Sequence, residues 1–128
     1  MRLLLDTCTF LWIVGGSEEL STKARQAFED PGNEVVLSAV SAWEIAVKHR
    51  LGRLPLPTRP ESFVPAQRVA HGIEPLALDE EAALQVAKLP DIHRDPFDRM
   101  LVAQAIASGL ILLTPDDDIR EYPVRTLW

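Results

Sequence analysis

Short apolar runs alternate along this chain with longer segments that mix apolar and polar residues. The runs 2–5 (Arg-Leu-Leu-Leu) and 110–113 (Leu-Ile-Leu-Leu) predict strands that are buried on both faces. Residues 34–37 and 124–127 are further strand candidates, and 76–78 is a weaker one. Because longer helical patterns separate these strands, the alternation predicts an α/β fold with a mainly parallel sheet.

The helical segments between the strands carry start and stop signals. The predicted helices run from Ser21 to about Asp30, from Ser41 to about Leu51, from Asp79 to Pro90, and from Asp95, followed by Pro96, to Ser108. Residues 61–71 are also predicted to be helical, with Pro65 either in the first turn or at a kink. The proline-rich stretch 53–60 predicts an extended connector. We therefore expect residues 1–128 to form one domain, a three-layer α/β sandwich around a mainly parallel central sheet.

Four carboxylates that are far apart in sequence are expected at one edge of that sheet. Asp6 directly follows the first strand, and Asp116 follows the strand that ends near Leu113. Glu44 and Asp98 are each expected in the first turn of a helix. In a parallel sheet the strand C-termini and the N-termini of the returning helices share an edge, where ligands bind. Carboxylates packed together repel one another, and a hard cation such as Mg²⁺ or Mn²⁺ relieves that repulsion.

Each acid also has a purely structural interpretation. Glu44 completes a capping box with Ser41, Asp98 suits the positive end of its helix, and Asp116 fits a turn or cap. Asp6 is harder to explain in this way, because a charge that closes a buried strand is costly unless it is paired or bound to metal. Four unrelated structural acids need not converge on one edge, so we expect a metal site.

Net charge leaves the question of a nucleic-acid partner open. The 128-residue chain is 47% apolar and 25% charged, with a formal net charge of −6. Without the four acids, 15 acidic and 13 basic residues remain. The segment between Glu44 and Gly72 carries more basic than acidic residues. A bound cation would also reverse the local sign at the acids.

Features of the chain ends and of cysteine usage predict a cytoplasmic protein. The single cysteine, Cys8, cannot form an intrachain disulfide and fits a reducing compartment. The N-terminus reaches a charge after three leucines, too soon for the apolar core of a signal peptide. No apolar run approaches the ~20 residues needed to span a bilayer. We therefore expect no membrane partner.

Other candidate chemistry is weak. The histidines are dispersed and form no zinc signature with one cysteine: His49, His71 and His93. Cys8 lacks a placed His–Asp pair that would activate a thiol, so a packing role is expected. The three tryptophans are also expected to pack rather than to stack on bases: Trp12, Trp43 and Trp128.

Several segments in the expected order resemble the PIN-domain ribonucleases, in particular the VapC-like toxins of bacterial and archaeal toxin–antitoxin pairs. The matching segments are Leu3-Leu4-Leu5-Asp6-Thr7, residues 38–48 with Ser41-Ala42-Trp43-Glu44, Leu89-Pro90, residues 93–105 with Asp95-Pro96-Phe97-Asp98-Arg99, Leu113-Thr114-Pro115-Asp116, Tyr122-Pro123-Val124 and Leu127-Trp128. The resemblance covers nearly the whole chain. Cys8 departs from the residue expected after the first Asp-Thr, and Asp118 competes with Asp116 as the fourth acid.

The resemblance implies a metal-dependent endoribonuclease, usually dimeric, which a cognate antitoxin holds inactive. Asp6 and Asp98 would be the principal ligands of Mg²⁺ or Mn²⁺, and Glu44 and Asp116 would complete the pocket. Three cations are candidates to hold the RNA backbone: Lys48, Arg50 and Arg99. Their structural alternatives are a helical pair with Glu44, plain solvation and a pair with Asp95. The short apolar stretch 10–14 is a candidate dimer face or simply packs on its own sheet.

Three rival interpretations remain. A haloacid-dehalogenase-type phosphatase needs a second Asp at the position of Cys8. A phosphoacceptor receiver domain needs paired acids after the first strand and a lysine near the last strand. Here Asp6 stands alone, and Arg125 is the only cation in the last predicted strand. The third is a catalytically silent module of PIN-like fold that only binds a partner protein, against which the complete set of four acids counts.

Overall fold

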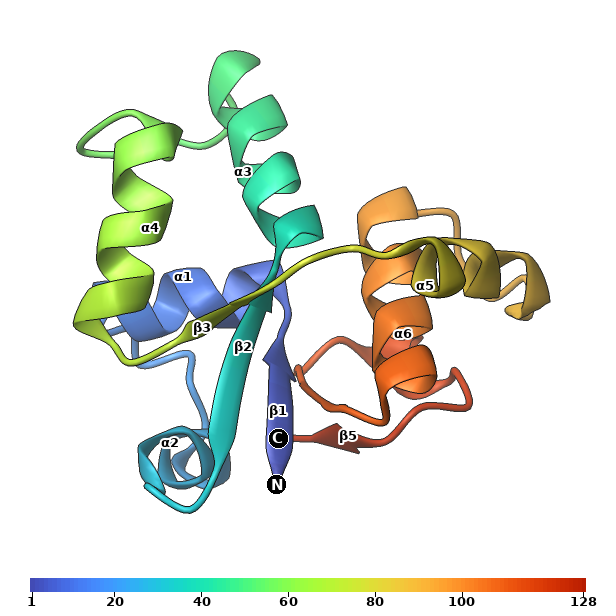
Figure 1. Ribbon diagram of the computed structural model, residues 1–128. Helices are drawn as coiled ribbons and strands as arrows, with labels where there is room; N and C mark the ends of the chain where they lie inside the picture. The colour runs from blue at the N-terminus through green and yellow to red at the C-terminus, as the bar shows by residue number, and fades with distance from the viewer.

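A five-stranded parallel sheet forms the centre of the computed structural model, which describes all residues 1–128 (Figure 1). Its strands are β1 (Arg2–Leu5), β2 (Glu34–Ser38), β3 (Glu74–Leu76), β4 (Ile111–Leu113) and β5 (Thr126–Leu127). They lie in the order β3-β2-β1-β4-β5, and every neighbouring pair is parallel. The first strand is thus central, which explains why its three leucines are fully buried.

Alternation along the strands sends side chains to two separate cores. Leu3 and Leu5 of β1 join one core cluster, whereas Leu4 joins the other. The same alternation holds in β2, where Val35 and Leu37 face the first cluster and Val36 the second. Two cores on opposite faces of one sheet make three layers, as predicted.

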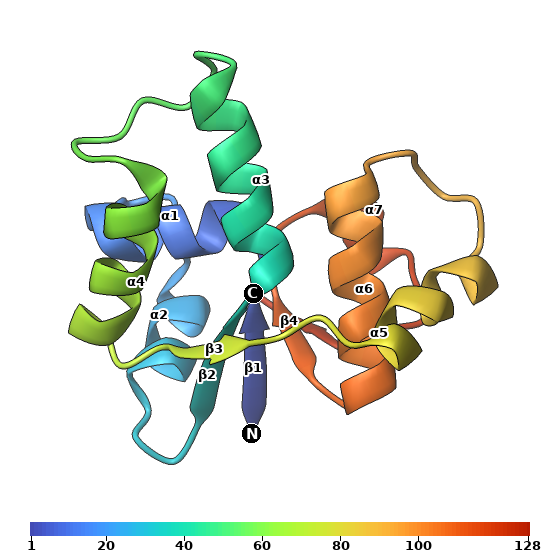
Figure 2. The ribbon, with the colours of Figure 1, turned by 45° about the horizontal axis from the view of Figure 1, so that its top comes forward.

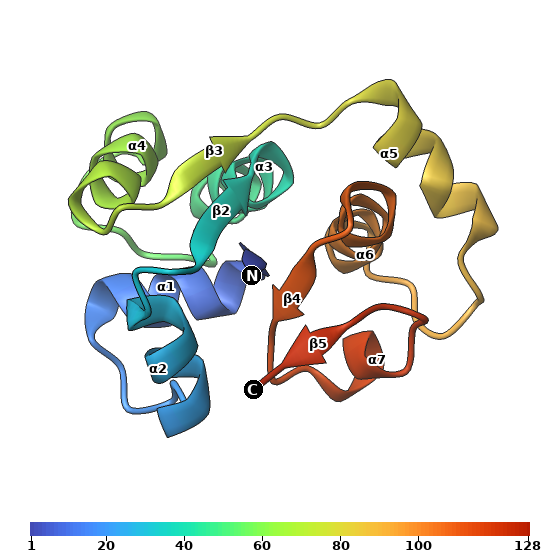
Figure 3. The same cartoon turned by 60° about the horizontal axis from the view of Figure 1, so that its bottom comes forward.

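Helices cover both faces. They are α1 (Thr7–Gly15), α2 (Thr22–Glu29), α3 (Ala39–Arg50), α4 (Pro60–Ala70), α5 (Glu80–Gln85), α6 (Pro96–Ser108) and α7 (Asp117–Arg120), with a 3₁₀ turn at Val86–Lys88. Figure 3 shows α1, α2 and α4 on one side of the sheet and α5, α6 and α7 on the other. No helix has the length and apolar character that crossing a membrane requires.

Most predicted caps are confirmed, but Ser41 is not one. Ser21, Asp79 and Asp95 each accept a hydrogen bond from a backbone N–H at the start of their helix. The cap of α3 is instead Ser38, whose hydroxyl accepts from Val40 N at 2.9 Å. The helix therefore starts directly at the end of β2, three residues earlier than predicted. Ser41 is fully buried inside it.

Proline positions explain two smaller differences. The helix predicted at 61–71 begins at Pro60, so Pro65 lies in its second turn rather than its first. The weak strand predicted at 76–78 is β3 at Glu74–Leu76, where Pro75 pairs with Leu37. A proline is tolerated there because β3 is an edge strand that need not donate a further ladder hydrogen bond. Only Thr126–Leu127 of the last predicted strand pairs with the sheet.

Candidate active site

The four predicted acids all lie toward the edge of the sheet where β1, β2 and β4 end. Asp6 is the N-cap of α1, and Asp116 is the N-cap of α7. Asp98 lies in the first turn of α6. Glu44 lies in the second turn of α3, rather than the first, because this helix begins at Ala39. Figure 2 shows α1 and α3 leaving the sheet at the tips of β1 and β2. We call these four residues the acidic edge.

Asp6 is buried and firmly held. Its side chain is 5% exposed, Oδ1 accepts from Thr9 N at 2.8 Å, and Oδ2 accepts from the Thr114 hydroxyl. Burial raises the pKa of this carboxyl, the hydrogen bonds from Thr114 and Thr9 oppose that rise, and the charge of Asp116 adds to it. The environment of Asp6 therefore favours either protonation of the carboxylate or a positive charge beside it.

The pKa of Asp98 is raised as well. Burial, followed by the charge of Asp95, raises the pKa of Asp98 to about 7. The negative charges of Asp116 and Glu44 act in the same direction, whereas a hydrogen bond from His93 opposes them. Asp116 and Glu44 thus act on Asp98, and Asp116 also acts on Asp6. These interactions support the predicted convergence of the four acids.

Asp98 also contacts a network of side chains that the sequence did not reveal. His93 Nε2 lies 3.4 Å from Asp98 Oδ2, and His93 Nδ1 lies 2.8 Å from the Tyr122 hydroxyl. Arg99 Nη1 donates to that hydroxyl at 3.0 Å and to Pro90 O at 2.9 Å. Arg99 therefore does not pair with Asp95, as its structural interpretation supposed. His93 lies five residues before Asp98, but no local pattern indicated Tyr122.

Glu44 sits in a second polar network. The Thr7 hydroxyl donates to Glu44 Oε1 at 2.6 Å and lies 2.9 Å from the Ser41 hydroxyl. All three residues are buried. Lys48 forms the expected ion pair with Glu44 Oε2, which raises the pKa of the lysine. The capping box predicted between Ser41 and Glu44 is wrong, because the carboxylate faces Thr7 and Lys48 rather than the helix N-terminus.

Burial distinguishes Asp116 from the two acids that follow it, Asp117 and Asp118. Asp116 is half-buried, and its Oδ1 accepts from Asp118 N at 2.8 Å and Ile119 N at 3.1 Å. Its own N–H donates to Thr114 Oγ1, the hydroxyl that also contacts Asp6. Asp117 and Asp118 are exposed. Thr114 thus links the acids that follow β1 and β4.

Comparison with known proteins identifies the family. A family model described as the PIN domain matches residues 3–124. This chain belongs to the PIN-domain family. It is 30% identical to Ribonuclease VapC22 of Mycobacterium tuberculosis over 131 aligned residues, which cover 98% of each chain. It is 44% identical to Ribonuclease VapC16 of the same organism over 57 residues, or 44% of this chain and 40% of that one.

Solved structures share the fold of this PIN domain. VapBC2 from Rickettsia felis bound to a promoter DNA fragment gives a TM-score of 0.74 at 12% identity and covers 98% of this chain and 97% of that one. DNA-bound VapBC from Salmonella typhimurium gives 0.69 at 19% identity, covering 98% and 96%. The predicted PIN-like three-layer fold is therefore confirmed.

The packing roles predicted for Cys8 and the tryptophans of this PIN domain are confirmed only in part. Cys8 is exposed, so its predicted packing role is wrong. Although the residue is exposed, partial desolvation of its thiol and then the charges of Asp6 and Glu44 raise its pKa to about 11, which keeps it a thiol at neutral pH. Trp12 and Trp128 contact each other with ring centroids 5.8 Å apart, as predicted for packing residues. Trp43 is 56% exposed and does not fit that prediction.

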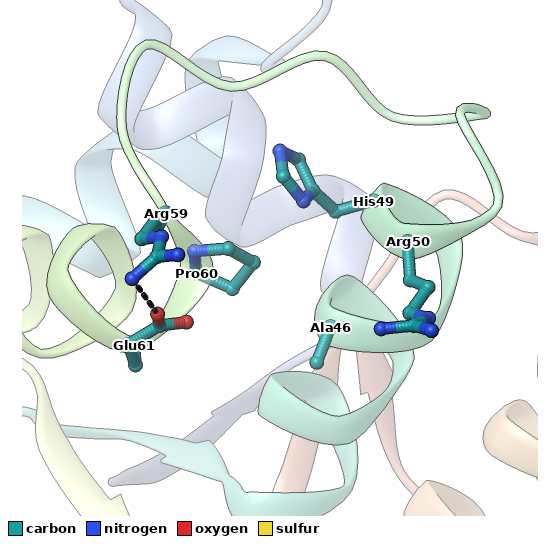
Figure 4. Close-up of a pocket in the computed structure, with 6 residues that line it drawn as sticks. All are labelled: Ala46, His49, Arg50, Arg59, Pro60 and Glu61. Atoms are coloured by element: carbon teal, nitrogen blue, oxygen red, sulfur yellow. Dashed lines mark ion pairs between the residues drawn. The ribbon is translucent and has the colours of Figure 1, made fainter.

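A basic hollow of about 480 Å³ lies between the end of α3 and the start of α4 (Figure 4). Its lining residues are Ala46, His49, Arg50, Arg59, Pro60 and Glu61. Arg59 Nη1 lies 3.8 Å from Glu61 Oε1, whereas Arg50 is exposed and has no ion-pair partner. None of the four acids lines this hollow, so it is separate from the acidic edge.

Proposed function

We propose that this chain is a metal-dependent endoribonuclease and the toxin of a toxin–antitoxin pair. The observation that carries the proposal is the acidic edge: two acids with raised pKa values, Asp6 and Asp98, come from different elements and have Glu44 and Asp116 within electrostatic range. Burying such a set costs stability unless it binds something positive. The names of its relatives, both called ribonucleases, support RNA as the substrate.

The donor chemistry fits Mg²⁺ or Mn²⁺. Every donor at the acidic edge is a carboxylate oxygen, the type of ligand that these hard cations prefer. No three His, Cys, Asp or Glu side chains lie close enough here to form a complete metal-binding group. Mg²⁺ usually keeps several waters and takes one or two carboxylates from the protein, so a partial protein shell is compatible with it. Asp6 and Asp98 would be the main ligands, with Glu44 and Asp116 acting directly or through water.

The bound cation would polarise the scissile phosphate and lower the pKa of an attacking water. The chain's own residues would orient the acids and hold the substrate. Thr9 N and Thr114 fix Asp6, and His93 fixes one oxygen of Asp98. A carboxylate of the acidic edge would accept the proton of the water. Lys48 and Arg50, on the exposed part of α3, would contact the RNA backbone.

The partner that we propose is a small antitoxin that places a basic side chain among the acids. An Arg guanidinium matches carboxylates in a bidentate manner and would compete with the cation. The related fold in Rickettsia felis and in Salmonella typhimurium was solved as a VapBC complex. We propose that the protein acts in the cytoplasm on cellular RNA, as a homodimer. Light scattering should then give twice the 14.3 kDa of one chain.

Cleavage of RNA by the purified protein tests the enzymatic proposal. We expect cleavage with Mg²⁺ or Mn²⁺, none in excess chelator, and no rescue by Zn²⁺. Expression of the chain without its partner should arrest growth, and Asp6→Asn should relieve that arrest. If the wild-type protein is soluble, abundant and harmless, and cleaves no RNA with either ion, the silent-module alternative becomes the better explanation.

A further inference from the structure

Trp43 is the one large aromatic side chain that the fold leaves open to solvent. It is 56% exposed, whereas Phe10, Phe63 and Tyr122 are buried. Leaving half of an indole in water forgoes much of the favourable free energy that burial would provide. The side chain of Phe97 supports the indole from one side. The ring of Phe97 meets Trp43 edge to face, with centroids 4.8 Å apart and an interplanar angle of 68°.

The position of this aromatic pair ties it to the acidic edge. Trp43 immediately precedes Glu44 on α3, and Phe97 immediately precedes Asp98 on α6. The two rings therefore bridge the two helices that carry two of the four acids. The Phe97 contact supports the indole in one orientation, so its exposed surface needs less ordering when a ligand binds.

We infer that Trp43 is a stacking surface for an unpaired RNA base that adjoins the phosphate to be cleaved. This inference rests on the proposed ribonuclease function. Unpaired bases splay away from the RNA backbone and stack on aromatic rings, and stacking accepts every base because each has a π face. Because Trp43 adjoins Glu44, a base that stacks on the indole would belong to a nucleotide next to the scissile phosphate. Trp43 thus adds affinity for single-stranded RNA without selecting its sequence.

Aliphatic surface residues provide a matched control. Leu51, at the end of the same helix, is 59% exposed and similarly apolar, but it lacks a π face and lies two turns from Glu44. If exposed apolar area alone drove RNA binding, Leu51→Ala and Trp43→Ala would have similar effects. If stacking drives it, Trp43→Phe retains most of the binding and Leu51→Ala all of it.

The test measures binding of a short labelled single-stranded RNA of mixed sequence to the full chain carrying Asp6→Asn, which prevents cleavage. Adding Trp43→Ala should weaken binding about tenfold, as expected for one stacked base. Trp43→Phe should lose much less, and Leu51→Ala should change nothing. RNA should also quench tryptophan fluorescence in the parent but not in the Trp43→Phe variant. With an RNA that is abasic at every position, the parent and Trp43→Ala should bind equally.

The outcomes separate this inference from the proposed function. If wild-type protein cleaves RNA but Trp43→Ala binds mixed-sequence RNA as tightly as the parent, the stacking role is wrong while the enzyme assignment stands. An equal loss on the normal and the abasic RNA would also overturn it, because the effect would then be structural. If Trp43→Ala impairs only capture by the antitoxin, the surface serves a protein partner instead. Absence of both RNA binding and cleavage in the wild type would overturn both proposals.

Discussion

The two sides of the acidic edge are built differently. On one side, Asp6 and Glu44 are almost fully buried. The hydroxyl of Thr114, which follows β4, donates to Asp6, and that of Thr7, which begins α1, donates to Glu44. On the other, Asp98 is 19% exposed and is reached by His93, which precedes α6. Both threonines lie next to central strands of the sheet, and such core elements open less readily than loops. The comparison indicates one half that is anchored next to the central strands and one half whose geometry depends on the loop before α6.

The strongest test of this comparison removes one charge from each half. Asp6→Asn and Asp98→Asn should each lower RNA cleavage at least about 100-fold, because each would remove the charge of a proposed metal ligand. The fold should survive in Asp6→Asn: the amide oxygen can still accept from Thr9 N, and its NH₂ can donate to Thr114. Cleavage rates with Mg²⁺, together with circular dichroism, measure both effects.

Asp117→Asn is the matched control, since it removes the same charge from a residue whose side chain is 99% exposed. It should leave cleavage unchanged. If either Asp6→Asn or Asp98→Asn retains activity within about threefold of the wild type while folded, a gap far below that expected for a lost metal ligand, that acid has no direct part in the reaction.

The next test addresses the half of the acidic edge that the loop before α6 holds. If Asp98 holds the cation as proposed, His93 and Tyr122 serve as its positioning residues. His93→Gln should then weaken Mg²⁺ binding and lower kcat about tenfold, with a smaller change in KM for RNA. Tyr122→Phe keeps the buried ring but removes the hydroxyl shared by His93 and Arg99, and should cost about 1 kcal/mol of stability. Titration calorimetry with Mg²⁺ and thermal unfolding measure these effects. Unchanged Mg²⁺ affinity in His93→Gln would show that Asp98 is held without it.

A second division, between local signals and contacts of distant segments, explains what the sequence could predict. Apolar runs, caps at Ser21, Asp79 and Asp95, and Gly109 with its positive φ are local signals, and they placed most elements correctly. Parallel-sheet geometry then placed the four acids at one edge. The start of α3 was mispredicted because Ser38 and Ser41 are both plausible caps, and only the pairing of β2 up to Ser38 decides between them.

Contacts between distant segments could not be predicted. Tyr122 meets His93 across 29 residues, and Thr7 meets Glu44 across 37. Neither pair follows a helical or strand period, so no pattern in one sequence reveals it. The exposure of Trp43 was missed for the same reason: its partner Phe97 lies on another helix. Local chemistry thus identified the acids, whereas the residues that orient them depend on tertiary packing.

The smallest expected effect concerns stability and pH. The folded protein raises the pKa of Asp98 from 3.8 to about 7, mainly through burial and the charge of Asp95. The protonated carboxyl is therefore favoured by folding, and this contribution is complete below pH 3.8. It is lost progressively as the pH rises toward 7, because the folded state must then carry an unfavourable charge. Other carboxylates titrate in the acidic part of that range, so the comparison with a variant isolates this one group.

Asp98→Asn keeps the shape of the side chain and removes its charge. In metal-free buffer it should be more stable than the wild type at pH 8, by on the order of 1 kcal/mol after allowance for solvent screening. The gain should shrink as the pH falls from 7 toward 5. Asp117→Asn again serves as the control and should show no such dependence. Thermal unfolding of the three proteins between pH 5 and pH 8 provides the measurement.

If Asp98→Asn and the wild type keep the same difference in stability across that range, Asp98 titrates below it and the acidic edge does not raise its pKa. Adding Mg²⁺ at pH 8 should reverse the order, since only the wild type gains stability from binding the cation through Asp98.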